Sequence, residues 1–281
     1  MGKIILSAFA DEHSESFEKQ LQFLNESSIE YIEIRGVDGK NISDLSPAEV
    51  KACAEALKSS GIKAASIGSP LGKVAIDGNL DEHFEKAKRV FETAASLSCG
   101  LCRVFSFYIP EGKDPDAFSG KVTEGLGKMI ELAENCGVTL CHENEHGIYG
   151  ESPKRIIELL NTFGEKLKCV FDMGNFVLDG HKPYPDAYTL LRDDIKYFHI
   201  KDALSEGAIV PAGCGNACIK EILDAHMEYC ANDFVVSLEP HLQTFAGFNA
   251  LTDRTFDNPY KFESKEQAFV EAIRHFRNLW N

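Results

Sequence analysis

The sequence predicts a closed barrel of eight parallel β-strands, each followed by a helix, which is a (β/α)8 fold. Short apolar runs alternate with longer amphipathic segments along the chain. Eight such units in 281 residues match the usual length of a one-domain α/β barrel. No G-x-G-x-x-G follows the first apolar run, which disfavours the runner-up, an open Rossmann-like sheet.

The expected strands are short, and strands that alternate with helices form parallel sheets. We expect them at residues 3–7, 31–35, 63–67, 102–107, 139–143, 168–172, 196–201 and 234–239. Their carboxyl ends would then share the face of the barrel on which barrel active sites are built.

The expected helices begin with polar residues and end near glycine, and these residue types are preferred at the amino and carboxyl ends of helices. They lie within residues 16–28, 46–61, 81–100, 118–137 and 152–165. A last helix within 264–281 should pack against the outside of the barrel. Residues 243–261 form a longer aromatic loop, which either covers part of the upper face or packs locally. No linker interrupts the pattern, so residues 1–281 are expected to form a single domain.

Composition limits the class of protein. A formal net charge of -15 makes nucleic acid a poor default partner, because phosphate backbones would be repelled. No apolar stretch approaches membrane-spanning length, and the first residues do not resemble a signal peptide. Nine cysteines without framework spacing, including the C-x-x-C at Cys99 and Cys102, indicate reduced core or turn thiols. We expect a soluble cytoplasmic protein without a membrane partner.

The chemistry is concentrated at the ends of strands five to eight, which read CHENE, VFDMGN, YFHIKDA and VSLEPH. Glu143, Asp172, His199 and Glu239 are 29, 27 and 40 residues apart, so each gap spans at least about one βα unit. Three carboxylates and one imidazole suit Mn²⁺, Mg²⁺, Co²⁺ or Zn²⁺. A single acid at a strand end is usually a helix cap or a surface charge, so spacing alone leaves both interpretations open.

The motifs HENEHG, FDMGNF, FHIKDA, PAGCG and SLEPH, in this order, resemble the xylose isomerase-like TIM barrel superfamily. This group holds sugar phosphate isomerases and epimerases, hydroxypyruvate isomerase, inosose dehydratase and endonuclease IV. The resemblance covers essentially the whole chain, and its specific motifs lie within residues 139–241. It implies one divalent metal ion held by Glu143, Asp172, His199 and Glu239. Glu145 is a second candidate on strand five, although the E-N pair favours Glu143.

Other polar residues border the expected site. Strand alternation places Lys201 beside His199 and His241 beside Glu239. His241 could bind substrate, and Lys201 either binds a substrate oxygen or phosphate or forms a salt bridge with a neighbouring acid such as Glu239. Arg35 and His146 are further substrate-binding candidates, with a surface ion pair and a solvated loop histidine as the alternatives. His142 should point away from Glu143. The glycine loop at residues 211–216 either presents backbone N–H groups to a substrate oxygen or is only a turn.

The resemblance implies that Glu143 and Glu239 transfer protons through a metal-bound cis-enediolate. The expected activity is isomerisation or epimerisation of a small sugar, sugar phosphate or similar polyhydroxy carbonyl compound. A dehydratase of a keto-polyol would use the same ligands. A nuclease like endonuclease IV is disfavoured, because Asn175 and residues 208–210 stand where its additional histidines would be. Barrels of this kind often pair as homodimers, and the sequence leaves the oligomeric state open.

Overall fold

The computed structural model describes residues 2–242, 258 and 260–280. Its main sheet has eight strands in the order β1-β12-β9-β8-β7-β6-β5-β2. Every neighbouring pair in this sheet is parallel. The end strands β1 and β2 are in contact, so the sheet forms a nearly closed barrel. Its strands are β1 (Ile4–Ala8), β2 (Tyr31–Ile34), β5 (Lys63–Gly68), β6 (Leu101–Val104), β7 (Thr139–Glu143), β8 (Leu167–Asp172), β9 (Ile195–Ile200) and β12 (Phe234–Leu238).

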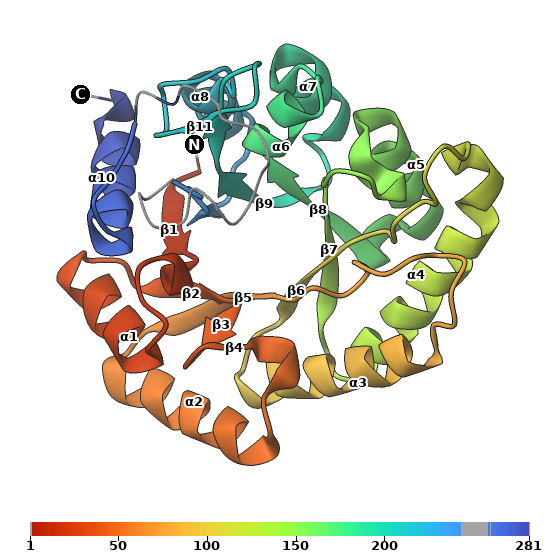
Figure 1. Cartoon of the computed structure of the whole chain (residues 1–281), viewed down its shortest axis with the longest axis horizontal. Helices are drawn as coiled ribbons and strands as arrows, with labels where there is room; N and C mark the ends of the chain where they lie inside the picture. Colours follow the sequence, from red (N-terminus) through yellow and green to blue (C-terminus); the bar gives the residue numbers. More distant parts are fainter. Residues whose placement is uncertain (1, 243–257, 259, 281) are drawn as a thin grey trace.

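Helices surround this sheet, as Figure 1 shows. All six expected helical segments are confirmed. The α-helices are α1 (Phe17–Glu26), α2 (Pro47–Ser60), α3 (Asp81–Ser96), α4 (Ser119–Glu134), α5 (Pro153–Phe163), α6 (Met173–Leu178), α7 (Tyr188–Leu191), α8 (Ile219–Tyr229) and α10 (Lys265–Arg277).

Local sequence explains where several helices begin. The side chains of Ser16, Ser46, Ser152 and Ser264 accept hydrogen bonds from the third residue of the helix that follows each of them. Such caps satisfy backbone N–H groups that have no partner within the helix. Gly61 ends α2 with a φ of 77°, a left-handed conformation that glycine adopts without strain.

The last helix packs outside the barrel, as expected. In Figure 1, α10 lies between α1 and α8 at the edge of the molecule. The buried ring of Phe269 on α10 meets that of Phe23 on α1 at a centroid distance of 5.7 Å. The aromatic loop expected at residues 243–261 lies mostly outside the described residues.

Two short antiparallel hairpins extend the loops on the carboxyl side of the barrel, and the sequence did not predict them. One pairs β3 (Gly36–Val37) with β4 (Lys40–Asn41), and the other pairs β10 (Asp202–Ala203) with β11 (Ile209–Val210). The strand expected at residues 102–107 is shorter, because after Val104 the backbone bonds to a loop instead. Phe105 N–H donates to the carbonyl of Leu71, and Phe107 has a φ of 67°. No helix of the described residues is long and apolar enough to cross a membrane.

Candidate metal centre

The structure brings together the four residues predicted from the strand ends. Nδ1 of His199 lies 3.0 Å from Oε1 of Glu143, 3.2 Å from Oε2 of Glu239 and 3.9 Å from Oδ2 of Asp172. All four residues are buried, and one ligand atom from each lies within 4.8 Å of the others. They cluster because β7, β8, β9 and β12 are consecutive neighbours in the sheet and each ends within one residue of its polar residue.

Asn144 and Asp172 connect the ends of β7 and β8. The Asn144 side chain donates to the carbonyl of Asp172 at 2.9 Å and accepts from its N–H at 3.0 Å. Oδ1 of Asp172 caps α6 by accepting from the N–H of Asn175 at 2.7 Å. This arrangement gives the asparagine of the E-N pair a structural role, and it leaves Oδ2 of Asp172 directed into the cluster.

The strand-five alternatives lie in different places. Glu143 belongs to the buried cluster, whereas Glu145 forms an ion pair with Lys73 at 2.7 Å. His142 points away from Glu143, as expected, and Nε2 of its buried ring lies 2.9 Å from Oγ of Ser106. The expected alternation along β7 is therefore confirmed, and of the two acids only Glu143 lies in the cluster.

Two buried cations, Lys201 and Arg103, lie against the carboxylates. Nζ of Lys201 lies 2.9 Å from Oδ2 of Asp172 and 3.6 Å from Oε2 of Glu239. Arg103 lies between the two acids predicted to transfer protons, 3.1 Å from Oε2 of Glu143 and 3.6 Å from Oε1 of Glu239. Arg103 was not predicted from the sequence. An arginine within a short apolar run, LCRVF, was the available signal.

The charges of the cluster change the affinities of its members for protons. Burial raises the pKa of Asp172 to about 7, although Lys201 opposes this shift. Burial also acts to raise the pKa of Glu143, but His199 and Arg103 outweigh it and lower that pKa to about 2. Against burial, Glu143 and Glu33 raise the pKa of His199 well above its ordinary value. Without a metal ion, the site therefore favours a proton on His199, which partly compensates the carboxylates.

The donor set fits a divalent cation. Three buried oxygens, Oε2 of Glu143, Oδ2 of Asp172 and Oε2 of Glu239, accept no hydrogen bond of regular geometry within the described part of the chain, although each forms an ion pair, with Arg103, Lys201 and His199 respectively. Buried carboxylate oxygens are normally hydrogen-bonded or bound to metal. Three oxygens and one imidazole nitrogen suit Mg²⁺, Mn²⁺, Co²⁺ or Zn²⁺ better than a metal that prefers thiolates.

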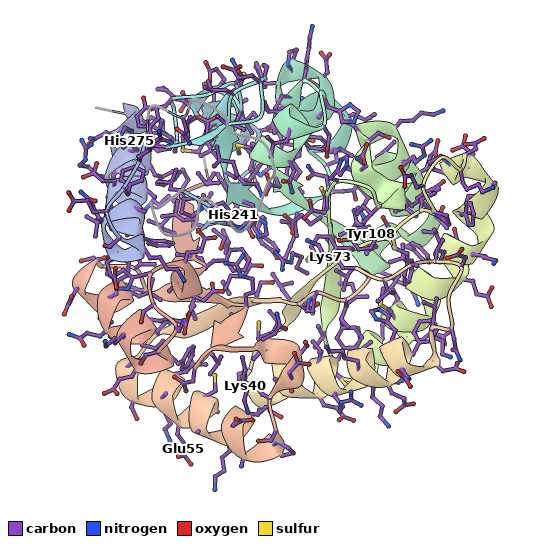
Figure 2. All side chains as sticks on the ribbon, viewed as in Figure 1. Lys40, Glu55, Lys73, Tyr108, His241 and His275 are labelled. Atoms are coloured by element: carbon purple, nitrogen blue, oxygen red, sulfur yellow. The ribbon has the colours of Figure 1, made fainter. Side chains whose placement is uncertain are left out.

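The predicted substrate-binding residues occupy different positions. Figure 2 shows His241 over the middle of the barrel, together with Lys73. Nε2 of His241 lies 3.5 Å from Oε1 of Glu239 and 3.2 Å from Oε1 of Glu12. Arg35 pairs with Glu239 at 2.9 Å and with Asp11 at 2.8 Å. Both residues therefore line the entrance to the cluster.

His146 lies in a different group. Its Nδ1 is 2.9 Å from Oδ1 of Asp179 and 3.6 Å from Oε2 of Glu151, and its side chain is 84% exposed. Within the described part of the chain, it forms no hydrogen bond or ion pair with the four clustered residues. The alternative of a solvated loop histidine describes this position better than a substrate ligand does.

The glycine loop has an internal partner. The N–H groups of Gly213 and Gly215 donate to Oδ2 of Asp202 at 2.9 and 3.0 Å, and that of Ala217 donates to Oδ1 at 3.0 Å. The interpretation of this loop as a substrate oxygen site is therefore wrong. The loop binds the carboxylate of the H-x-K-D motif, because Asp202 lies 2% exposed directly beneath it.

The sequence agrees with this architecture. A sequence model of the family described as "Xylose isomerase-like TIM barrel" matches residues 21–279. The chain belongs to the xylose isomerase-like TIM barrel family. This finding confirms the fold and the resemblance predicted from the motifs at the ends of strands five to eight.

Solved structures share the fold at low sequence identity. The IOLI protein with a bound zinc atom is 18% identical, with a TM-score of 0.71, over 99% of this chain and 98% of that one. The probable 3-DHS dehydratase AsbF from Bacillus anthracis is 18% identical, with a TM-score of 0.71, over 99% of both chains. D-Psicose 3-epimerase from Clostridium cellulolyticum H10, solved with D-tagatose, is 13% identical, with a TM-score of 0.69, over 97% of this chain and 96% of that one. No relative was found among proteins of curated function.

Proposed function

We propose that this protein is a divalent-metal-dependent isomerase or epimerase of a small sugar or sugar-like polyhydroxy carbonyl compound. The observation that carries the proposal is the buried cluster of Glu143, Asp172, His199 and Glu239, in which one ligand atom from each residue lies within 4.8 Å of the others. The zinc-bound IOLI protein and the psicose epimerase share this fold, which supports the reaction class.

The four clustered residues would hold the metal ion. When bound, a divalent ion polarises a carbonyl and a neighbouring hydroxyl and so makes the proton on the adjacent carbon more acidic. Its charge would also compensate for the mutual repulsion of the three carboxylates, which the nearby cations only partly relieve.

Glu143 and Glu239 are suited to move that proton. They come from β7 and β12, yet both place an oxygen close to Nδ1 of His199, at 3.0 and 3.2 Å. One carboxylate removes the proton from carbon to give a cis-enediolate, and the other returns a proton. Return to the adjacent carbon gives isomerisation, and return to the opposite face of the same carbon gives epimerisation.

Arg103 orients this pair of acids. Its guanidinium lies within 3.6 Å of both and is itself held by the carbonyl of Gly68 at 3.1 Å. Substrate hydroxyls would be bound by Lys201 beside the cluster and by His241 and Arg35 at the entrance. Whether the substrate is a free sugar or a sugar phosphate depends on these loop contacts.

The test combines metal analysis with isotope exchange. The purified protein is assayed for bound Mn²⁺, Mg²⁺, Co²⁺ and Zn²⁺, then incubated with a panel of ketoses and polyols in deuterated water. We expect about one divalent ion per chain and deuterium at the carbon next to the carbonyl of at least one substrate. Absence of bound metal, or exchange that Glu239→Gln leaves unchanged, would refute the proposal.

Glu145→Gln is the matched control, since it removes the same charge two residues from Glu143 without touching the cluster. Glu143→Gln should lower metal affinity and abolish exchange, and Glu145→Gln should preserve both. Equal losses in the two variants would contradict the assignment of Glu143.

A dehydratase is the second candidate, favoured by the fold shared with AsbF. The same carboxylates could remove a proton while a β-hydroxyl leaves as water. Product analysis by NMR separates the two reactions, because elimination gives a new alkene or enol and isomerisation conserves composition.

The free cysteines of the described chain suit a reducing compartment such as the cytoplasm.

A further inference from the structure

Glu33 is a buried acid that the sequence did not assign to the site. It lies near the end of β2 and is 1% exposed, although β2 is far from β9 in the order of the sheet. The near-closure of the barrel brings it to the imidazole of His199, where its Oε2 lies 3.0 Å from Nε2. Alternation along β2 was the missed signal, since Glu33 shares a side of the strand with Arg35.

Glu33 is itself held in place. Its Oε1 accepts a hydrogen bond from the hydroxyl of Tyr197 at 2.8 Å, and that hydroxyl lies 2.9 Å from Oγ of Ser66. Ser66 and Tyr197 are both about 1% exposed. The Glu33 carboxylate therefore has its orientation fixed by neighbours that cannot exchange their contacts with water.

The ring of His199 is confined as well. The aromatic rings of Phe9 and Tyr197 meet it at centroid distances of 5.1 and 5.4 Å, with interplanar angles of 75° and 62°. Its two nitrogens therefore face different partners. Nδ1 faces the clustered carboxylates, and Nε2 faces Glu33.

We propose that Glu33 is a positioning residue that keeps the ring hydrogen of His199 on Nε2 and so presents the lone pair of Nδ1 to the metal ion. A neutral imidazole has one N–H, and the nitrogen that binds a metal cannot carry it. Carboxylate partners of this kind fix the orientation of metal-binding histidines, and their loss typically costs 10–100-fold in metal affinity. The inference rests on the proposed metal site and adds a fifth residue to it.

Zinc binding tests the inference without relying on activity. Zn²⁺ affinity is measured by competition with a chelator for the wild type, Glu33→Gln and Glu33→Met. Methionine is close in size to glutamate but offers no oxygen to Nε2–H, so we expect about 10–100-fold weaker binding. Glutamine retains one oxygen and should restore part of the affinity. Ser66→Ala, at the far end of the chain of contacts, should change affinity less than about threefold, well below the loss expected for direct partners of the ligand.

A spectroscopic measurement keeps the inference testable if Glu33→Met fails to fold. In ¹⁵N NMR of the zinc-loaded wild type, the hydrogen of His199 should reside on Nε2, with Nδ1 bound to zinc. A hydrogen on Nδ1, or a folded Glu33→Met variant that binds zinc as tightly as wild type, would overturn the role of Glu33 alone. Failure of the wild type to bind any divalent ion would instead overturn the proposed function.

Discussion

Asp202 offers a quantitative test of how the loop after β9 is held. Its Oδ1 accepts hydrogen bonds from the N–H groups of Ala203 and Ala217, and its Oδ2 accepts from those of Gly213 and Gly215. Asp202→Asn keeps one oxygen and turns the other into an NH₂ group, which would face two N–H donors. The variant therefore loses two hydrogen bonds to a charged acceptor within a buried site.

Each hydrogen bond to a charged group contributes about 1.5–3 kcal/mol, so the two lost bonds predict a destabilisation of about 3–6 kcal/mol. The free energy of unfolding is measured by urea denaturation followed by circular dichroism. Hydrogen exchange at the Gly213 and Gly215 amides should accelerate as well, because those N–H groups lose their acceptor.

Asp233→Asn is the matched control. Exposed Asp233 accepts one hydrogen bond from the N–H of Lys3, and the variant keeps an oxygen for it. We expect a change of at most about 0.5 kcal/mol. A loss below about 1 kcal/mol for Asp202→Asn, with unchanged exchange at both glycines, would refute the account of the loop.

Three further predictions concern stability. Burial lowers the pKa of His142 from 6.5 to about 4, so folded His142 stays neutral while the unfolded chain takes up a proton below pH 6.5. Its contribution to the free energy of unfolding is therefore complete above pH 6.5 and is lost as the pH falls towards 4. Between pH 7 and pH 4.5, the free energy of unfolding measured in urea should fall by about 2–3 kcal/mol less for His142→Asn than for the wild type. An equal fall in the two proteins would contradict this prediction. Gly174→Ala should destabilise by about 1–3 kcal/mol, because its Cβ would lie 2.6 Å from Cγ and 2.8 Å from the carbonyl oxygen of Lys201. The control Gly120→Ala, with no atom within 4 Å of the added Cβ, should leave unfolding unchanged or improve it, and equal effects would exclude steric contact as the cause. Removal of divalent metal with a chelator should lower the melting temperature of the wild type, and it should lower that of Asp172→Asn by less. A wild type that melts at the same temperature with and without chelator would count against a bound ion.

The sequence by itself determined the fold and most of the cluster. Apolar runs of strand length, separated by capped amphipathic segments, can bury their apolar faces only as layered strands and helices. Polar residues at the ends of four consecutive barrel strands meet at one face, so the pattern made Glu143, Asp172, His199 and Glu239 candidates. The resemblance of their motifs to the family then implied that these four residues form one set of metal ligands. The distinction between His142 and Glu143 also followed from strand alternation alone.

The tertiary structure decided which partners those residues have. Glu33 and Arg103 reach the cluster from β2 and β6, and their distances to His199 and Glu143 depend on the curvature of the barrel rather than on local sequence. The partner of the glycine loop was also decided by the tertiary structure, because nothing in PAGCGN shows that Asp202 lies beneath it. Contacts between segments distant in sequence depend on how the strands close into the barrel. A periodic pattern along the chain does not give the distances between side chains on strands that are far apart in sequence.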